Sequence, residues 1–305
     1  MPSPLLPSPA APTAPVPTPW RVASETATLR DVLVCPPDHY RWLPTNSIAR
    51  RPLAEARQGP ALPHLQAQHA ELVAALEQGG ARVHLLRPEP HLPYMVYTRD
   101  SVVVTHQGPV LCQLERPQRR GEYFFLIDWH RKQGSAFWKM SNAGTLEGGD
   151  IHILRPGLAV IGHSGGRTDE AGAEQLAGWL RAEGWEVRLQ PFEEHFLHLD
   201  VLFCMAAPGL AVACEAVLDD GFLAWLRGHG IRTIPVGYRD AMQLGCNILA
   251  LGGERVISAR GSTALNAALR AEGLTVLDPE LSLFTLGGGG PHCLTCPLAR
   301  EEETA

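Results

Sequence analysis

The sequence has few of the features that mark nucleic-acid-binding or membrane proteins. Charged residues make up only 19% of the 305 residues, and their balance leaves a net charge of −6. There is no run rich in Lys and Arg, so the basic surface that neutralises phosphates in nucleic-acid-binding proteins is not expected. No apolar stretch reaches the roughly 18 residues of a membrane-spanning helix. We therefore expect neither a nucleic acid nor a membrane as a partner.

The cysteine pattern is not that of a disulfide framework. The seven cysteines are odd in number and irregularly spaced, and Cys35, Cys112, Cys204 and Cys214 lie inside apolar, strand-like runs. Buried, reduced thiols fit this pattern better than disulfides, so we expect a cytoplasmic protein. The 30 glycines and 26 prolines indicate many turns and disfavour an all-α fold.

The N-terminal segment does not have the composition of a secretory signal. Its first twenty residues carry eight prolines and no Lys or Arg, so the basic region and the unbroken apolar region are both missing. The sequence predicts a disordered, Pro-rich tail over residues 1–22. A single domain is expected over residues 23–300, followed by an acidic tail over residues 301–305.

Four stretches repeat one pattern, in which two apolar runs flank a turn that contains Gly. They start at Ser101, Ile151, Leu199 and Asn247, which are 50, 48 and 48 residues apart. The pattern is typical of β-hairpins. A helical stretch and a further short strand follow, as in TDEAGAEQLAGWLRAEGWEVRLQ, where Thr168 is the expected N-cap.

The two ends of the chain are expected to supply a fifth hairpin. GGGGPHCLTCPL begins at Gly287, where the next hairpin is due, and LRDVLVCPP from Leu29 would complete that unit. Five ββαβ-like units then account for the ordered chain, and each unit must pack on its neighbours to bury its apolar face. We predict an α/β fold in which the five units form a closed ring. Two unrelated α/β domains are the alternative.

Polar side chains stand at the same position in each repeat, where an apolar strand begins. In a ring of related units these strand ends meet at one end of the central axis, so we expect the side chains to line one pocket. Taken singly, each of them could merely cap a strand at a turn. The set comprises Asp100, Asp150, His198, Asp200, Asn247 and Cys293.

Cys293 is the candidate nucleophile, because it follows a run of glycines that lets the backbone approach a ligand closely. His198 is the best candidate for its base, and Glu147 in LEGGD could orient the imidazole. Other roles stay open: Cys293 and Cys296 form a CxxC motif that suits a zinc or redox site, and His195 and His198 could ligate a metal. His198 could also be a core histidine.

The two carboxylates indicate the charge of the substrate. Asp100 and Asp200 would face a pocket whose nucleophile is a thiol. Two anions favour a planar, permanently cationic group that is bound by paired hydrogen bonds, and a guanidinium is such a group.

Four motifs together resemble the guanidino-group-modifying enzymes, which comprise arginine deiminases, dimethylargininases and amidinotransferases. The motifs are YTRDSVVV around Asp100, LEGGD at Glu147, HLD at His198 and Asp200, and GGGGPHCLTCPL at Cys293. The resemblance covers roughly residues 29–299. It implies a five-bladed α/β propeller of pseudo-fivefold ββαβ repeats, called the pentein fold.

The resemblance also implies roles for individual residues. Cys293 resembles the nucleophile, His198 the general acid/base and Glu147 its partner. Asp100 and Asp200 would grip the guanidinium. Two arginines in RRGE and GGRTDEAGAE, Arg120 and Arg167, match positions that hold the substrate's α-carboxylate in the family.

The implied reaction is hydrolysis of arginine or a methylated arginine through a covalent amidino-thioether, giving citrulline, with no cofactor and no metal. An amidinotransferase would form the same intermediate but admit an amine instead of water. A non-catalytic protein of the same fold is a further alternative. The oligomeric state stays open, with a homodimer as one option.

The motif HLD bears on the substrate within this family. Dimethylargininases commonly carry Lys after HL, whereas the Asp form resembles arginine deiminases and amidinotransferases. A dimethylated nitrogen cannot donate a hydrogen bond to Asp200, so this residue disfavours methylarginine. The short chain and the motifs around Arg120 and Arg167 nevertheless resemble dimethylargininases.

Overall fold

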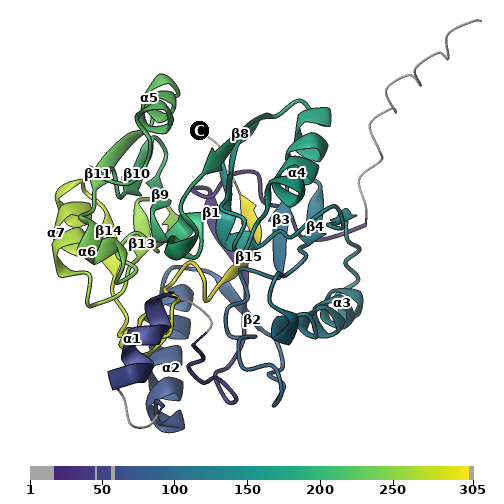
Figure 1. Ribbon diagram of the computed structural model, residues 1–305, viewed down its shortest axis with the longest axis vertical. Coiled ribbons are helices and arrows are strands. Elements are labelled where there is room, and N and C mark those ends of the chain that lie inside the picture. The colour runs from purple at the N-terminus through teal and green to yellow at the C-terminus, as the bar shows by residue number, and fades with distance from the viewer. Residues whose placement is uncertain (1–16, 45–46, 56–58, 302–305) are drawn as a thin grey trace, which may run out of the picture.

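The strands of the described residues form five separate three-stranded sheets that share one pattern (Figure 1). The computed structural model describes residues 17–44, 47–55 and 59–301. In every sheet the middle strand pairs antiparallel with one neighbour and parallel with the other. This is the hairpin-plus-parallel-strand arrangement that the ββαβ repeat predicts.

Four of the sheets follow the order of the chain. The first holds β3 (Val102–Thr105), β4 (Gly108–Leu111) and β5 (Lys139–Met140). The second holds β6 (Ile151–Arg155), β7 (Leu158–His163) and β8 (Glu186–Pro191). The third holds β9 (Phe203–Ala207), β10 (Leu210–Ala213) and β11 (Arg232–Pro235). The fourth holds β12 (Leu249–Gly252), β13 (Arg255–Ile257) and β14 (Thr275–Leu277).

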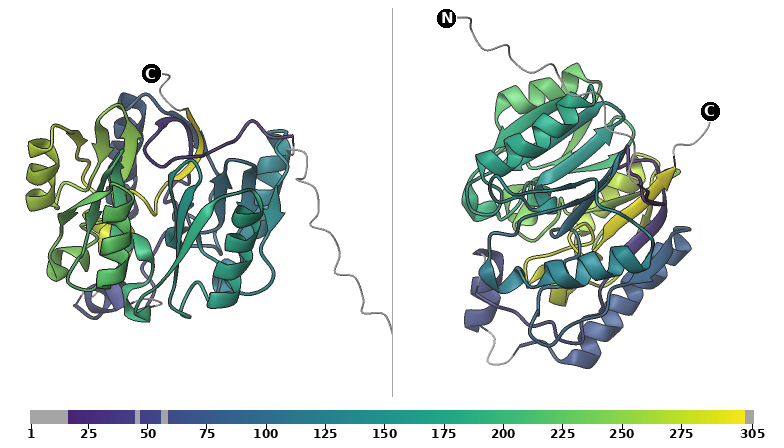
Figure 2. Two further views of the ribbon diagram at one scale, coloured as in Figure 1. Left: turned by 90° about the horizontal axis from the view of Figure 1, so that it is seen from above. Right: turned by 90° about the vertical axis from the view of Figure 1, so that its right-hand side faces the viewer.

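The fifth sheet joins the two ends of the described chain. It consists of β15 (Cys296–Glu301), β1 (Thr28–Val34) and β2 (Arg82–Leu85). β1 pairs antiparallel with β15 and parallel with β2, so the prediction that the early strand completes the last unit is confirmed. Figure 2 shows β15, in yellow, beside the purple early strand.

One helix links the second and third strands of each unit and lies at the periphery in Figure 1, outside the strands. These helices are α2 (Leu62–Gln78), α3 (Glu122–Lys132), α4 (Glu170–Ala182), α5 (Asp220–Gly228) and α7 (Thr263–Ala271). The other helices of the described chain are α1 (Ser47–Glu55), which precedes α2 between β1 and β2, α6 (Tyr238–Ala241) and α8 (Ser282–Thr285). Four 3-10 turns are η1 (Pro117–Arg119), η2 (Gly148–Asp150), η3 (Glu194–Phe196) and η4 (Leu199–Val201).

The helix α4 shows why these segments become helical. Its buried residues include Ala173, Leu176, Ala177 and Leu180, whose spacing forms one apolar stripe that packs against the sheet. The N-cap is Asp169, whose carboxylate accepts a hydrogen bond from the backbone of Gly172 at 2.7 Å. The predicted N-cap one residue earlier is therefore wrong, because that threonine hydroxyl bonds elsewhere, as described below.

The ordered chain begins before the predicted boundary at residue 23. Trp20 and Val22 are buried, and the ring of Trp20 stacks on that of Trp129 at 6.1 Å between centroids. The backbone of Val22 donates to the carbonyl of Thr105 at 3.1 Å. Glu301 likewise belongs to β15 rather than to a tail. The remaining parts of the two predicted tails, residues 1–16 and 302–305, lie outside the described residues.

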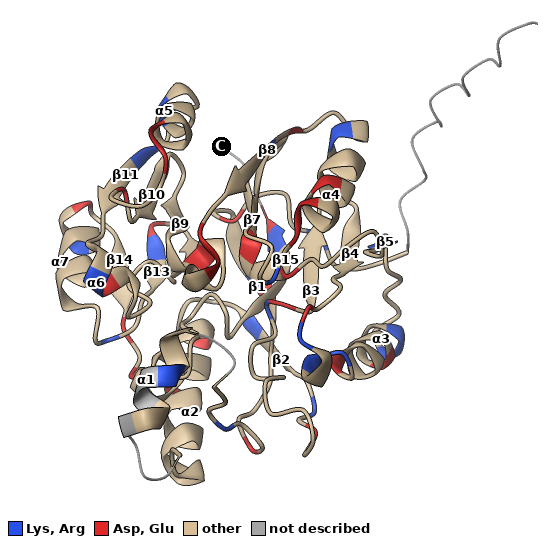
Figure 3. Cartoon of the chain, viewed as in Figure 1, with Lys and Arg blue, Asp and Glu red and all other residues tan. Residues whose placement is uncertain are grey.

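Charged residues occur in two kinds of place. Figure 3 shows Lys, Arg, Asp and Glu on the outer helices and also among the inner strands, near β7 and β15. Within the described residues, no helix is both long and apolar enough to cross a membrane.

Candidate active site

The polar residues that were predicted from their shared position in the repeats lie where the first strand of each unit begins. Asp100 precedes β3, and Asn247 precedes β12. His198 lies directly before η4, Asp200 lies within it, and η4 leads into β9. Asp150 ends η2 directly before β6, and Cys293 lies in the loop before β15. Glu147, which was selected from the motif LEGGD and not from the repeat, precedes η2. All five units therefore supply polar groups from equivalent places.

Cys293 is buried and is held between Asp200 and Asn247. Its Sγ lies 3.2 Å from Oδ2 of Asp200, and Nδ2 of Asn247 donates to it at 3.1 Å. The Oδ1 atom of Asn247 also accepts from the backbone N–H groups of His292 and Cys293, at 3.0 and 3.2 Å. One amide thus fixes both the thiol and its loop. A Cβ on Gly290 would lie 2.8 Å from that Oδ1, so the approach requires glycine.

Burial and neighbouring anions keep the thiol protonated. Burial first, and then the charges of Asp200 and Asp100, raise the pKa of Cys293 well above its ordinary value. Cys293 is therefore a thiol at neutral pH. A cation between the two carboxylates would reverse the electrostatic part of this effect, because it would favour the thiolate.

His198 is paired with Glu147. Its Nε2 donates to Oε2 of Glu147 at 2.9 Å, and its Nδ1 lies 3.8 Å from Oδ1 of Asp100. Burial would lower the pKa of His198, but the carboxylates of Asp100, Asp150 and Glu147 outweigh burial and raise it to about 10. His198 is therefore an imidazolium at neutral pH, and its Nδ1–H lies on the side of Asp100.

Glu147 is fully buried and stays ionised. Burial raises its pKa, but Arg167 and His198 overcome this effect and hold the pKa well below its usual range. Nη1 of Arg167 donates to Oε2 of Glu147 at 3.4 Å. The backbone N–H of Glu147 donates to Oγ1 of Thr168 at 3.0 Å, which is the bond that occupies the threonine hydroxyl.

The backbone around His198 is specialised. Leu197 has φ 72° and ψ −68°, and the N–H of His198 donates to the carbonyl of Phe196 at 2.9 Å, which forms a strained γ-turn. On the other side, a Cβ on Gly149 would lie 2.7 Å from Nδ1 of His198. The second glycine of LEGGD thus allows the imidazole to lie against the backbone.

Asp100 is held by an arginine that the sequence analysis did not select. Nη1 of Arg119 donates to Oδ2 of Asp100 at 2.5 Å, and its Nε donates to Oε1 of Glu122 at 2.8 Å. All three side chains are buried. The i,i+3 spacing of Arg119 and Glu122 across η1 and α3 is the signal in RRGE that favours Arg119 as the inward arginine.

The neighbouring Arg120 points elsewhere. It is exposed, and its guanidinium donates to the carbonyls of Leu114 and Glu115, each at 3.2 Å. Arg167 is buried and lines a cavity of about 350 Å³ together with Arg50, Arg116 and His195. Of the two arginines predicted to hold an α-carboxylate, only Arg167 contacts the pair formed by Glu147 and His198.

Four buried carboxylate oxygens have no hydrogen-bond partner among the described residues: Oδ1 of Asp100, Oε2 of Glu115, Oδ2 of Asp150 and Oδ1 of Asp200. That of Glu115 lies 2.9 Å from Nε of Arg116 in an ion pair. Those of Asp100 and Asp200 belong to the two carboxylates whose charges raise the pKa of Cys293, and in each the other oxygen is bonded. An unpaired buried acceptor is costly, so such atoms mark a place for a ligand with N–H donors. The thiol of Cys293 lies on the Asp200 side of this pair.

Two groups of side chains have the donor types of a metal site, with ligand atoms within 4.8 Å of one another. In the first, comprising Asp100, Glu147 and His198, the imidazole is protonated at neutral pH and its Nε2 donates to Glu147, so it has no free lone pair for a metal ion. The second comprises His152, Cys204 and His292 and is considered below. Cys293 and Cys296 have different partners, since Cys296 donates to the carbonyl of Val102 at 3.3 Å.

Comparison with known sequences identifies the family. The profile of the family described as N,N dimethylarginine dimethylhydrolase, eukaryotic, matches residues 55–300. The chain is 28% identical over 285 residues to the uncharacterized protein YkgA of Bacillus subtilis, covering 92% of this chain and 95% of YkgA. It is 30% identical over 274 residues to an arginine deiminase of Rhodococcus erythropolis, covering 78% of this chain and 66% of that enzyme.

A longer relative matches over part of its length only. The bifunctional arginine dihydrolase/ornithine cyclodeaminase AgrE of Nostoc sp. is 28% identical over 275 residues, and the match covers 86% of this chain. The chain spans 37% of the length of AgrE.

Solved structures show the same fold. The N-terminal domain of ArgZ bound to product, an arginine dihydrolase from cyanobacteria, superposes with a TM-score of 0.76 at 23% identity. That match covers 88% of this chain and 97% of the domain. A dimethylarginine dimethylaminohydrolase adduct with 4-chloro-2-hydroxymethylpyridine gives 0.69 at 20% identity, covering 88% and 99%. Since the profile spans most of the sequence, the chain belongs to the N,N dimethylarginine dimethylhydrolase family, within the guanidino-group-modifying, or pentein, superfamily.

Proposed function

We propose that the protein hydrolyses the guanidino group of an arginine-type substrate through a covalent intermediate on Cys293. The observation that carries this proposal is a pair of buried carboxylate oxygens that accept no hydrogen bond from the described residues, Oδ1 of Asp100 and Oδ1 of Asp200, beside a buried thiol. A guanidinium offers N–H donors in one plane and a permanent positive charge, so it satisfies both oxygens at once. The relatives named as arginine deiminases and arginine dihydrolases support the same substrate class.

Binding of the substrate activates the nucleophile. The guanidinium charge between Asp100 and Asp200 offsets the anions that raise the thiol pKa, so Cys293 loses its proton more readily once the substrate is in place. The same contacts hold the guanidino carbon near Sγ, and this orientation contributes much of the rate acceleration.

The first half-reaction transfers the amidino group to sulfur. The Cys293 thiolate attacks the guanidino carbon and forms an S–C bond. The C–N bond to the terminal nitrogen then breaks, and Nδ1–H of His198 protonates the leaving amine, which departs as ammonia. His198 can act as this acid because its raised pKa keeps it charged at neutral pH.

The second half-reaction restores the enzyme. His198, now neutral, takes a proton from water, and the hydroxide attacks the thioether carbon. The C–S bond breaks, and the hydroxyl proton of the leaving ureido product passes to the sulfur, which restores the thiol whose own proton went to solvent in the first half-reaction. Glu147 orients the imidazole and stabilises its charged form in both steps.

The substrate that fits the two carboxylates best carries unsubstituted guanidino nitrogens. Each of the two oxygens needs an N–H donor, and a dimethylated nitrogen has none. We infer that arginine is preferred over dimethylarginine. The five sheets would then act as the blades of a five-bladed propeller that brings the strand ends together at the catalytic cluster.

The test is a panel of guanidino compounds assayed for product identity. Purified protein is incubated with arginine, monomethylarginine, dimethylarginine or agmatine, with and without glycine as an amine acceptor. Release of ammonia with an equivalent of ureido product supports hydrolysis. Formation of guanidinoacetate from glycine would instead assign amidino transfer. If the protein turned over none of these compounds, the proposal would be contradicted.

A further inference from the structure

His292, next to the proposed nucleophile in sequence, contacts the substrate-binding carboxylate rather than the substrate. Its Nδ1 donates to Oδ2 of Asp200 at 2.9 Å, and both side chains are buried. The same Oδ2 accepts the contact from Cys293 at 3.2 Å. Both donors therefore converge on one oxygen of Asp200, and the other oxygen, Oδ1, stays unpartnered among the described residues.

His292 contacts a second histidine, which is itself paired with a glutamate. The ring of His292 stacks on that of His152, with centroids 5.4 Å apart and planes 19° apart. Nδ1 of His152 lies 3.3 Å from Oε2 of Glu25. Burial raises the pKa of Glu25, but its interactions with His152 first, and also with Arg99, overcome this effect and lower the pKa to about 2, so the glutamate is an anion. Nε of Arg99 donates to the carbonyl of His292 at 3.2 Å.

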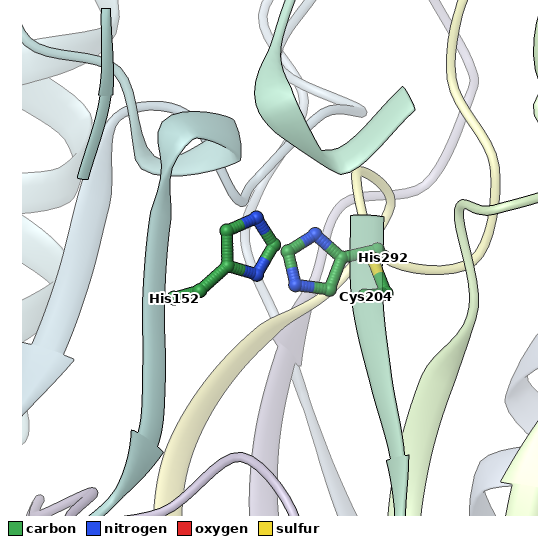
Figure 4. Close-up of side chains that lie close together, drawn as sticks. All are labelled: His152, Cys204 and His292. Carbon is green, nitrogen blue, oxygen red and sulfur yellow. The ribbon is translucent and has the colours of Figure 1, made fainter. Parts of the chain in front are cut away.

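The arrangement of the rings argues against a metal at this place. Figure 4 shows the imidazoles of His152 and His292 side by side, with the sulfur of Cys204 beside His292. The lone pair of an imidazole nitrogen lies in the plane of its ring. Because the two rings are stacked, their lone pairs lie in nearly parallel planes and do not converge on one ion. The cluster is better suited to fixing a carboxylate than to binding a cation.

We propose that His292 is a positioning residue of the active site, which holds the carboxylate of Asp200 so that its free oxygen faces the guanidinium of the substrate. This inference rests on the proposed function, because it assumes that Asp200 binds the guanidinium. The stack on His152 and the hydrogen bonds to the loop backbone fix the imidazole, and the imidazole fixes the rotation of the carboxylate.

The protonation states agree with this role. Burial and Arg99 lower the pKa of His292 to about 4, so the ring is neutral at physiological pH. The proton of the neutral ring lies on Nδ1, because a carboxylate oxygen can only accept. Burial raises the pKa of Asp200, but the hydrogen bond from His292, together with the charge of His198 and the hydrogen bond from Cys293, lowers it to about 2. The carboxylate of Asp200 is therefore ionised, and the hydrogen bond from His292 that favours its ionised form also orients it.

The experiment compares two alkylating agents that differ in charge. Chloroacetamidine is a planar cation with N–H donors, and chloroacetamide is its neutral counterpart. In both reactions the Cys293 sulfur forms a bond to the methylene carbon, chloride leaves, and the thiol proton passes to solvent. The ratio of the two labelling rates therefore cancels changes in thiol reactivity and reports the recognition of the cation.

Four variants separate positioning from stability. His292→Leu removes the donor, whereas His292→Asn keeps an N–H in the place of Nδ1. Asp200→Asn removes the anion itself. His130→Leu is the matched control, because His130 is also fully buried with a pKa lowered to about 4, but lies in α3.

We expect His292→Leu to reduce the labelling ratio roughly 10–100-fold, as loss of a supporting hydrogen bond does in other sites. His292→Asn should restore most of the ratio, and His130→Leu should leave it unchanged even if the protein unfolds at a lower temperature. A wild-type ratio equal to that of Asp200→Asn would overturn the proposed function itself. A ratio that falls in Asp200→Asn but not in His292→Leu would overturn only the positioning role.

Discussion

The Sγ atom of Cys293 lies 3.2 Å from Oδ2 of Asp200, so the proposed nucleophile rests directly against an anion. Such a neighbour disfavours the thiolate, which is the form that attacks a carbon centre. The arrangement is useful only if a cation arrives before the chemistry begins. In the proposed mechanism the reactivity of the thiol is therefore coupled to the charge of the substrate, and this coupling can be measured.

Removing the negative charge of Asp200 should make the free thiol more acidic. We expect Asp200→Asn to shift the pH profile of Cys293 alkylation by iodoacetamide to lower pH, because one of the anions that raise its pKa is gone. At pH 7 the variant should react faster than the wild type. The exposed Asp240→Asn serves as the control. Slower alkylation of Asp200→Asn at every pH would show that the carboxylate instead promotes thiol ionisation.

Asp200 should also carry much of the affinity for the guanidinium. In the inactive Cys293→Ser background, titration calorimetry with arginine measures binding without turnover. We expect a further Asp200→Asn change to weaken binding by about 2–5 kcal/mol, the scale for a buried charge pair that loses one member. Near-normal affinity in the double variant would remove Asp200 from the binding site.

Loss of the thiol should abolish turnover without unfolding the protein. We expect Cys293→Ser to lower kcat by at least about 10³-fold, since a serine hydroxyl is a poor nucleophile without its own activation. Cys296→Ser is the matched control, because it changes another buried thiol three residues away. The measurements are ammonia release and the thermal unfolding midpoint. Equal activity losses in the two variants would point to a structural cause.

The charge on His198 should make stability depend on pH in a defined direction. Its pKa is raised to about 10 in the folded state, so the folded protein binds this proton more tightly than the unfolded chain does. The contribution is fully present below about pH 6.5, the ordinary histidine value. It is lost as pH rises through 10.

The free energy of unfolding of the wild type and of His198→Gln tests this dependence. We expect the advantage of the wild type over the variant to shrink as the pH is raised from 6 towards 10. Denaturant titrations at several pH values give the difference directly. A difference that grows with pH would mean that the imidazole is neutral in the folded protein.

Arg167 should distinguish substrates by their carboxylate. We expect Arg167→Ala to lower kcat/KM for arginine more than for agmatine, which lacks the α-carboxylate. Arg167 also contacts Glu147, so an equal loss for both substrates would assign it to the orientation of His198 alone. Arg120→Ala provides the comparison, because its guanidinium is exposed and bonds to backbone carbonyls.

The sequence predicts much of the fold because the pattern repeats. Hairpins that recur near every 50 residues define equivalent strand ends, and polar residues at those ends can be selected without knowing the packing. The pairing of β1 with β15 follows from the same regular spacing, which places the fifth hairpin at the two ends of the chain. What the repeat cannot give is the direction of an individual side chain. Arg119 and Arg120 are adjacent, and only the turn of η1 decides that Arg119 faces Asp100.

The sequence does not reveal the proposed positioning role of His292, for a similar reason. It adjoins Cys293 in the sequence, but its partner Asp200 is 92 residues away, so no local spacing connects them. The predicted start of the domain at residue 23 was also wrong, because a single aromatic ring, that of Trp20, anchors the end of a Pro-rich segment that otherwise has the composition of a tail.

The most direct test of the account is to trap the intermediate during turnover. The wild type is mixed with excess arginine, quenched in acid within the first turnovers, and examined by intact-mass and peptide mass spectrometry. The account predicts an added mass equal to arginine less ammonia, located on the peptide that contains Cys293 and missing from Cys293→Ser. Turnover of arginine with no adduct on Cys293, or with the adduct on another residue, would contradict it.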